Sequence, residues 1–244
     1  PANRYAKRLK QKQHLDKIQH EKELYEDKVF FFTNIAHEIR TPLSLISAPL
    51  ESLLESDIKD EAADEYLNII EKNTKNLLLL VDQLLDFKNV NKHSIKLHYQ
   101  KADILKLIDD ISFLFKAQLS KSNKTLTIEN KTNSKKLEAI VDRDELFKIL
   151  NNLISNAVKY SHSNISISIK NIADNFEIHI INDGLLIPEK YRDKIFEPFF
   201  RVKEFSDISG SGIGLSLAYS LVMMHNGSLI YNAENNLNNF ILTI

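Results

Sequence analysis

Glycine is absent from residues 1–92, and all five glycines of the chain lie in its last quarter, at positions 184, 210, 212, 214 and 227. A glycine-free stretch rich in lysine, glutamate and leucine favours long helices. Apolar residues recur there in alternating steps of three and four, the repeat of a helix that packs along one seam. The seam residues are Val29, Phe32, Ala36, Ile39, Leu43, Ile46, Leu50 and Leu53.

A second apolar seam follows after a polar break at residues 55–60. It consists of Tyr66, Ile70, Asn73, Leu77, Leu80, Leu84 and Phe87. Two seamed helices joined by a short loop form an antiparallel hairpin, and a single hairpin buries its two seams poorly. We therefore expect a homodimer in which two hairpins make a four-helix bundle.

From residue 95 onwards the pattern changes to a mixture of strands and helices. Strands are expected at 95–101, 125–128, 165–169, 176–181, 228–232 and 240–244. Helices are expected at 103–121, 142–160 and 213–225, with Asp103 as an N-cap and Asn226-Gly227 as a C-terminal stop. This order predicts an α/β sandwich with helices on one face of a sheet.

Composition narrows the classes of function. The net charge of −1 gives no support to nucleic-acid binding by this chain, and the absence of cysteine excludes disulfides and thiolate metal sites. The longest apolar run, Leu77–Val81, is far too short to span a membrane. Because the chain starts at Pro1 without a signal peptide, we expect it to be a piece of a longer protein.

The first motif surrounds His37, which lies just off the first seam and is expected to face solvent. Thr41 is one turn further on the same face, and the neighbouring Glu38 can orient an imidazole or accept its proton. Pro42 removes the amide that would bond the carbonyl of Glu38, which loosens the helix beside His37. An exposed histidine with a carboxylate neighbour is a usable nucleophile, although His37 alone also fits an ordinary surface histidine.

The second motif is a polar helix face within residues 151–160. It gathers Asn152, Asn156, Lys159 and Tyr160. Amide oxygens can ligate Mg²⁺, and the lysine can neutralise phosphate charge. A plain polar helix surface explains the composition but not why these side chains share one face.

Three further motifs follow in the second half of the chain. Asn182-Asp183-Gly184 comes directly after an expected strand. An aromatic segment at 196–202 includes Arg201, which lies with Lys203 in an expected lid at 199–211. A glycine-rich run containing Gly210, Gly212, Gly214 and Leu215 opens the helix expected at 213–225. The N-terminus of a helix favours phosphate, but the run lacks the ending of a P-loop and the acidic partner of a Rossmann fold.

Together these motifs resemble the H, N, G1, F and G2 boxes of sensor histidine kinases, in the family's order and at similar spacing over residues 30–244. The segment from Phe30 to Leu43 is also similar to hybrid two-component sensors of the Bacteroides type. The resemblance implies a signal-transmitting helix at 1–28, a dimerisation and histidine phosphotransfer domain at 29–92, and a catalytic ATP-binding domain with the Bergerat (GHKL) fold at 93–244. The G1 box departs from the family pattern, because Asn182 replaces a common aspartate and Leu186 a common glycine.

The resemblance further implies phosphoryl transfer from Mg-ATP to His37 and onward to a response-regulator aspartate, with Glu38 as proton acceptor and Thr41 positioning water for the reverse reaction. It places ATP on Asn152, Asn156, Lys159, Tyr160, Asn182, Gly184, Arg201, Gly210, Gly212, Gly214 and Leu215, with Mg²⁺ on Asn156 and Asn152. A receiver domain, in the same parent chain or separate, is the implied partner. The chain would be the cytoplasmic portion of an inner-membrane sensor.

Two other classes of function stay open from the sequence. The first is a GHKL-type ATPase, against which the histidine motif on a bundle helix argues. The second is a non-catalytic dimeric scaffold whose altered G1 box no longer binds ATP.

Overall fold

The computed structural model describes residues 2–55, 60–91, 96–132, 134–172, 175–205 and 211–244. Contacts divide the chain into two compact units, Pro1–Leu80 and Val81–Ile244. Along the described helices, none is long and apolar enough to cross a membrane.

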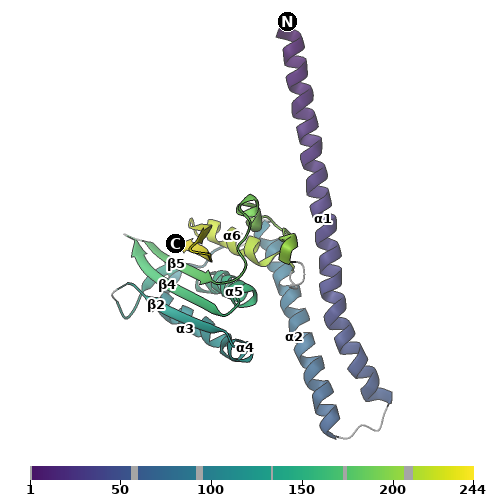
Figure 1. Cartoon of the computed structure of the whole chain (residues 1–244), viewed down its shortest axis with the longest axis vertical. Coiled ribbons are helices and arrows are strands. Elements are labelled where there is room, and N and C mark those ends of the chain that lie inside the picture. Colours follow the sequence, from purple (N-terminus) through teal and green to yellow (C-terminus); the bar gives the residue numbers. More distant parts are fainter. Residues whose placement is uncertain (1, 56–59, 92–95, 133, 173–174, 206–210) are drawn as a thin grey trace. The chain divides into compact units, whose positions relative to one another are not determined.

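The first unit consists of one long helix and most of a second, which continues past Leu80 (Figure 1). Helix α1 runs from Ala2 to Glu55, and helix α2 from Asp60 to Asn91, so the predicted hairpin is confirmed. The polar break was expected at residues 55–60, and residues 56–59 of it lie outside the described residues. Ile35 of α1 and Leu80 of α2 are buried in the single chain.

Part of the first seam is not buried within one hairpin. Phe32 is 67% exposed, Leu43 is 50% exposed and Leu50 is 45% exposed. Large apolar side chains on α2 are similarly open, among them Leu67 and Leu78. One chain therefore leaves an apolar surface along the hairpin uncovered.

The second unit is a two-layer α/β sandwich, as predicted. Its main sheet has the strand order β2-β4-β5-β7-β6, in which only the β2–β4 pair is parallel. The strands are β2 (Thr125–Asn130), β4 (Asn164–Ile172), β5 (Asn175–Asn182), β6 (Ser228–Glu234) and β7 (Leu237–Thr243). A small antiparallel sheet pairs β1 (Gln100–Asp103) with β3 (Glu138–Val141).

Helices cover one face of the main sheet (Figure 1). They are α3 (Ile104–Leu114), α4 (Lys116–Lys121), α5 (Arg143–Tyr160) and α6 (Gly214–Met224), with short 3-10 helices at Glu189–Tyr191, Lys194–Phe196 and Lys203–Phe205. Alternate residues of β4 and β5 are buried under this layer, and the residues between them face outward. The isoleucine- and leucine-rich core therefore lies between the helices and the sheet.

Several boundaries differ from the expected ones. The strand expected at 95–101 begins only at Gln100, because pairing with Val141 of β3 starts there, and β3 itself was not predicted. The helix expected at 103–121 is interrupted at the buried Phe115, although Asp103 does cap it by accepting from the amide of Lys106. The last strand begins at Leu237 rather than at Phe240, because its first three residues pair with β5 or β6.

Candidate functional site

His37 is exposed on the middle of α1, as its position beside the seam predicted. The hydroxyl of Thr41 donates to the carbonyl of His37 at 3.1 Å, so these two residues occupy one face of the helix. Glu38 is half-buried, and Pro42 lies inside the helix directly after Thr41. The imidazole of His37 is therefore open to solvent. The backbone carbonyl of His37 is bound by Thr41, and the next residue, Glu38, carries a carboxylate.

Helix α5 is fixed at its start by Asp142. This buried carboxylate accepts from the amides of Asp144 and Glu145 at 3.1 and 3.2 Å, and from the amide of His98 at 2.7 Å. Burial alone would raise the pKa of Asp142, but these backbone hydrogen bonds outweigh it and hold the pKa below its ordinary value. The same carboxylate thus caps α5 and anchors the segment that leads into β1.

Asn152 of α5 lies directly against the start of α6. Its amide nitrogen donates to the carbonyl of Lys148 at 2.9 Å, which directs its oxygen the other way. A Cβ placed on Gly214 would lie 2.9 Å from that oxygen, so only a glycine fits there comfortably. The structure therefore brings the second motif and the glycine-rich motif together, as the sequence predicted for one site.

The rest of the polar face of α5 continues toward its C-terminus. Asn156, Lys159 and Tyr160 are each half-buried. The ammonium of Lys159 lies 5.2 Å from the centre of the Tyr160 ring, and that ring is 5.9 Å from the ring of Phe205. The end of α5 is therefore in contact with the segment that enters the expected lid.

Asn182 and Gly184 lie where β5 ends against the C-terminus of α5. A Cβ on Gly184 would lie 2.0 Å from the carbonyl oxygen of Tyr160, so no other residue fits this turn. Asn182 is 3% exposed and belongs to the buried face of β5, under the helix layer. Its oxygen accepts from the amide of Gly184 at 3.1 Å.

Asp183, the neighbour of Asn182, has a structural role. Its carboxylate accepts from the amides of His162, Ser163 and Asn164 and from the Asn164 side chain, all between 2.9 and 3.1 Å. Burial opposes ionisation, but these hydrogen bonds prevail and lower its pKa. Asp183 therefore closes the turn between α5 and β4, which leaves Asn182 as the residue under the helix layer.

The glycine-rich motif is only partly within the described residues. Gly212 has a positive φ of 69°, and its carbonyl accepts from the amide of Phe199 at 3.1 Å, which joins the aromatic motif to the start of α6. Arg201 and Leu215 are half-buried. Gly210, with the rest of 206–210, lies outside the described residues, and so does the side chain of Lys203.

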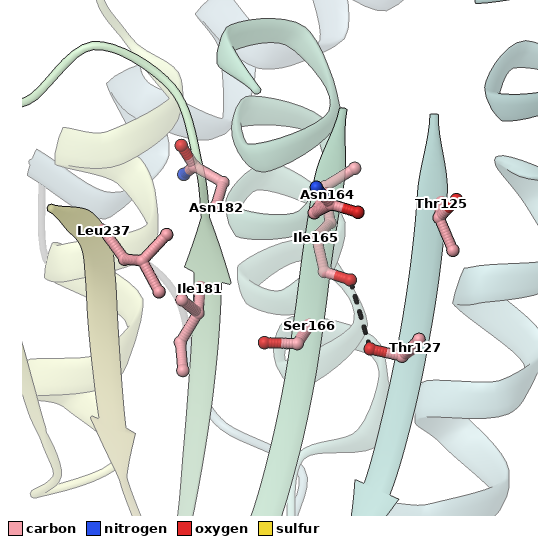
Figure 2. A pocket seen from close by; sticks show the side chains of 8 residues that line it. All are labelled: Thr125, Thr127, Asn164, Ile165, Ser166, Ile181, Asn182 and Leu237. Atoms are coloured by element: carbon pink, nitrogen blue, oxygen red, sulfur yellow. Dashed lines mark hydrogen bonds between the residues drawn. The ribbon is translucent and has the colours of Figure 1, made fainter. Parts of the chain in front are cut away.

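A shallow groove opens across the strands of the main sheet. Figure 2 shows it across β2, β4 and β5, with the hydroxyl of Thr127 donating to the carbonyl of Ile165. Thr127, Ser166 and Ile181 occupy outward positions on neighbouring strands. Asn182, at the end of β5, also borders this groove.

Sequence reasoning missed Asn238, the residue of β7 directly opposite Asn182 of β5. Its side-chain nitrogen donates to the oxygen of Asn182 at 3.2 Å and to the carbonyls of Gly184 and Leu185 at 3.1 Å. Because the expected strand began at Phe240, Asn238 was placed outside the sheet. The only signal available was a pair of asparagines just before an apolar strand.

The described residues contain no group of three or more histidine, cysteine, aspartate or glutamate side chains that could hold a metal ion. A divalent cation at this site would instead depend on amide oxygens together with a phosphorylated ligand. The oxygen of Asn152 fits that requirement, because its own nitrogen is already bound to Lys148.

Comparisons with known proteins match both units. Residues 27–92 match the His Kinase A (phospho-acceptor) domain, and residues 141–244 match the histidine kinase-, DNA gyrase B- and HSP90-like ATPase family. Histidine kinase P4 of Formosa agariphila is 35% identical over 91% of this chain, and the sensor histidine kinase WalK of Bacillus subtilis is 26% identical over 87%. The chain spans only 17% and 35% of those two relatives.

Solved structures agree in fold. The histidine kinase ThkA, in complex with the response regulator protein TrrA, has a TM-score of 0.63 at 25% identity, over 87% of this chain and 60% of that one. The histidine kinase AdeS of Acinetobacter baumannii has a TM-score of 0.62 at 23% identity, over 85% of this chain and 96% of that one. With an exposed histidine on α1 and asparagines that pack against Gly184 and Gly214 in an α/β sandwich, this chain belongs to the sensor histidine kinases, as a phospho-acceptor domain followed by a HATPase_c domain.

Proposed function

We propose that the chain transfers the γ-phosphoryl group of ATP to His37 and then to an aspartate of a response-regulator receiver domain. An imidazole nitrogen of His37 attacks the γ-phosphorus, and the bond to the bridging oxygen breaks, so ADP leaves with that electron pair. Glu38 accepts the proton that the imidazole must lose. The receiver carboxylate then attacks the phosphorus to form an acyl phosphate. The nitrogen–phosphorus bond breaks, and the imidazole regains a proton from Glu38 as it leaves in its neutral form.

The nucleotide site proposed for this reaction lies between α5, the end of β5 and the start of α6. The observation that carries it is the convergence of these elements, because Gly214 packs against the side chain of Asn152 and Gly184 against the carbonyl of Tyr160. The N-terminal amides and dipole of α6 favour the phosphates, with Gly210, Gly212 and Leu215 completing the loop. Arg201 of the lid would add positive charge to the γ-phosphate.

Mg²⁺ is the ion proposed for this site, held by Asn156 and Asn152 and by the phosphates. When bound, it would neutralise charge on the phosphate groups. Lys159 adds a second positive charge, and Tyr160, Asn182 and Gly184 line the side of the nucleotide base. Positioning and electrostatics, rather than covalent assistance, then account for the catalysis.

The proposed assembly is a homodimer through α1 and α2. The support for it is the exposed apolar surface that includes Phe32, Leu43 and Leu50, which a second hairpin would bury. We place a signal-transmitting helix at 1–28, the phosphotransfer domain at 29–92 and the ATP-binding domain at 93–244. The parent protein is proposed to be an inner-membrane sensor with this part in the cytoplasm.

Thr41 has a second proposed role, in removing phosphate from the receiver. Its hydroxyl is one turn from His37 and donates to the His37 carbonyl, so it can reorient toward a water without disturbing the helix. Its replacement by alanine should preserve phosphorylation of His37 and slow the loss of phosphate from the receiver.

Incubation with γ-labelled ATP tests the proposed function. The wild type should acquire acid-labile, alkali-stable label, and His37→Gln should acquire none while still binding nucleotide. His98→Gln is the matched control, because the His98 side chain is exposed and only its backbone amide is used. Label that persists in His37→Gln would overturn the assignment, and ATP hydrolysis without label would favour a GHKL-type ATPase.

A further inference from the structure

The hydrogen bonds around Asn182 determine which end of its amide can face a ligand. The side-chain oxygen accepts from the amide of Gly184 at 3.1 Å and from the side-chain nitrogen of Asn238 at 3.2 Å. A carbonyl oxygen has two lone pairs, and both are used here. Within the described part of the chain, no acceptor is bound by the Asn182 nitrogen.

The orientation of Asn238 is itself set by three backbone groups that cannot change roles, the amide of Ile187 and the carbonyls of Gly184 and Leu185. Its oxygen accepts from the backbone amide of Ile187 at 3.3 Å and from the hydroxyl of Tyr231 at 2.7 Å. Its nitrogen donates to the carbonyls of Gly184 and Leu185. A flipped Asn238 would set an N–H against the Ile187 amide and an oxygen against two carbonyls.

Asn182 consequently has one favourable orientation. Two donors, the Gly184 amide and the Asn238 nitrogen, face the same end of its amide, and only an oxygen satisfies both. Gly184 cannot swing away, because its turn is packed against the Tyr160 carbonyl. The Asn182 oxygen is therefore already occupied, and the nitrogen is the end left for a ligand.

We propose that Asn182 presents an N–H donor to the nucleotide base, so that the site prefers a purine with an oxygen at C6 over one with an amino group there. This inference rests on the nucleotide site proposed above. An adenine amino group facing the Asn182 nitrogen would place donor against donor, whereas the C6 oxygen of hypoxanthine or guanine accepts from it. A carboxylate at this position would reverse the preference, because it only accepts.

Three triphosphates separate the contributions of the base. ATP carries an amino group at C6, ITP carries an oxygen there, and purine riboside triphosphate carries only hydrogen while it keeps the N1 acceptor of adenine. Calorimetry on the full chain with Mg²⁺ should give ITP the tightest binding to the wild type, on the order of three- to tenfold tighter than ATP. Purine riboside triphosphate should bind the wild type at least as tightly as ATP.

In Asn182→Asp, ATP should bind more tightly than ITP, and purine riboside triphosphate should bind more weakly than ATP. Asn175→Asp is the matched control, because Asn175 is exposed at the opposite end of the same strand, and it should keep the wild-type order. Asn238→Ala removes one of the two donors that orient Asn182, so it should shift the ratio of affinities toward ATP. Thermal unfolding with bound ITP verifies that each variant is folded.

Three other outcomes would overturn the inference. Wild-type protein that binds ATP more tightly than both other nucleotides would mean that the amide turns its oxygen to the base. Equal binding of all three would mean that Asn182 does not contact the group at C6. In both cases the proposed nucleotide site would stand. The same holds if Asn182→Asp leaves the order unchanged. Absence of binding by every triphosphate, in wild type and Asn182→Asp alike, would remove the proposed function together with the inference.

Discussion

Replacement of Gly184 by alanine should damage the nucleotide site more than the fold. The added Cβ would lie 2.0 Å from the carbonyl oxygen of Tyr160 and 3.0 Å from the side-chain oxygen of Asn182. Ordinary contact begins near 3.4 Å, so the turn and the end of α5 must separate by roughly 1.4 Å. Both neighbours are backbone or hydrogen-bonded groups, and neither can move alone.

Overpacking of this kind costs about 1–3 kcal/mol of folding free energy. In a domain of this size that corresponds to a fall in Tm of about 3–10 °C. The same displacement moves Asn182 and Tyr160, and misplacement by about 1 Å can reduce a reaction rate by roughly 100-fold. We therefore expect Gly184→Ala to be folded but to lose most of its labelling by ATP.

Gly227→Ala is the matched control for this experiment. Its added Cβ would lie 2.4 Å from the carbonyl of Thr243, which is also a backbone clash, but at the turn between α6 and β6. It should lower Tm to a similar extent and leave nucleotide affinity of the folded protein unchanged. Thermal unfolding and calorimetry measure both quantities. Wild-type nucleotide affinity and labelling in Gly184→Ala would refute the placement of the base beside this turn.

Three further changes test the cap, the turn and the dimer. Asp142→Ala removes three amide hydrogen bonds and should lower the free energy of unfolding by about 1–2 kcal/mol, measured by thermal unfolding. The loss should be larger than in Asp103→Ala, because the Asp103 carboxylate accepts from only one described amide, at 3.4 Å. Equal losses in the two variants would contradict this prediction. Asp183→Asn should lower the free energy of unfolding by about 1–3 kcal/mol at neutral pH. The difference from wild type should shrink below about pH 4, because the stability that comes from the lowered pKa of Asp183 is present above its unfolded pKa and is lost as the pH falls through its folded pKa. A difference that persists in acid would contradict this role. Leu43→Asp should leave the helix content intact but abolish dimers in sedimentation. Leu45→Asp is the control, because Leu45 is about as exposed as Leu43 but lies off the seam, and this variant should still form dimers. Dimers that survive Leu43→Asp would refute the four-helix bundle.

The elements with strong periodicity could be predicted from the sequence. The two seams predicted α1 and α2, and Asp142 followed by an amphipathic run predicted α5 to within one residue. The regular alternation at Ile165, Ile167 and Ile169 predicted β4 in the same way. In these segments local preference and burial agree, so no distant contact is needed to determine the structure.

Features that depend on pairing between distant segments could not be predicted. Strand β3 forms because Glu138–Val141 meets β1, and its short, partly exposed pattern has no distinct period. Asn238 joins the candidate site only through its register with Asn182, 56 residues earlier. The motif at 182–184 indicated where a base would lie, but the direction of the Asn182 amide follows from Asn238, Ile187 and Gly184 together.

The central claim is that His37 receives phosphate from ATP. Its most direct measurement is mass spectrometry of peptides prepared at neutral pH after incubation with Mg-ATP, so that an acid-labile phosphoramidate survives. The account predicts one phosphorylated peptide, with fragment ions that place the added phosphate on His37. Phosphate found on a serine, threonine or different histidine, or none on the peptide that contains His37 while ATP is bound, would contradict it.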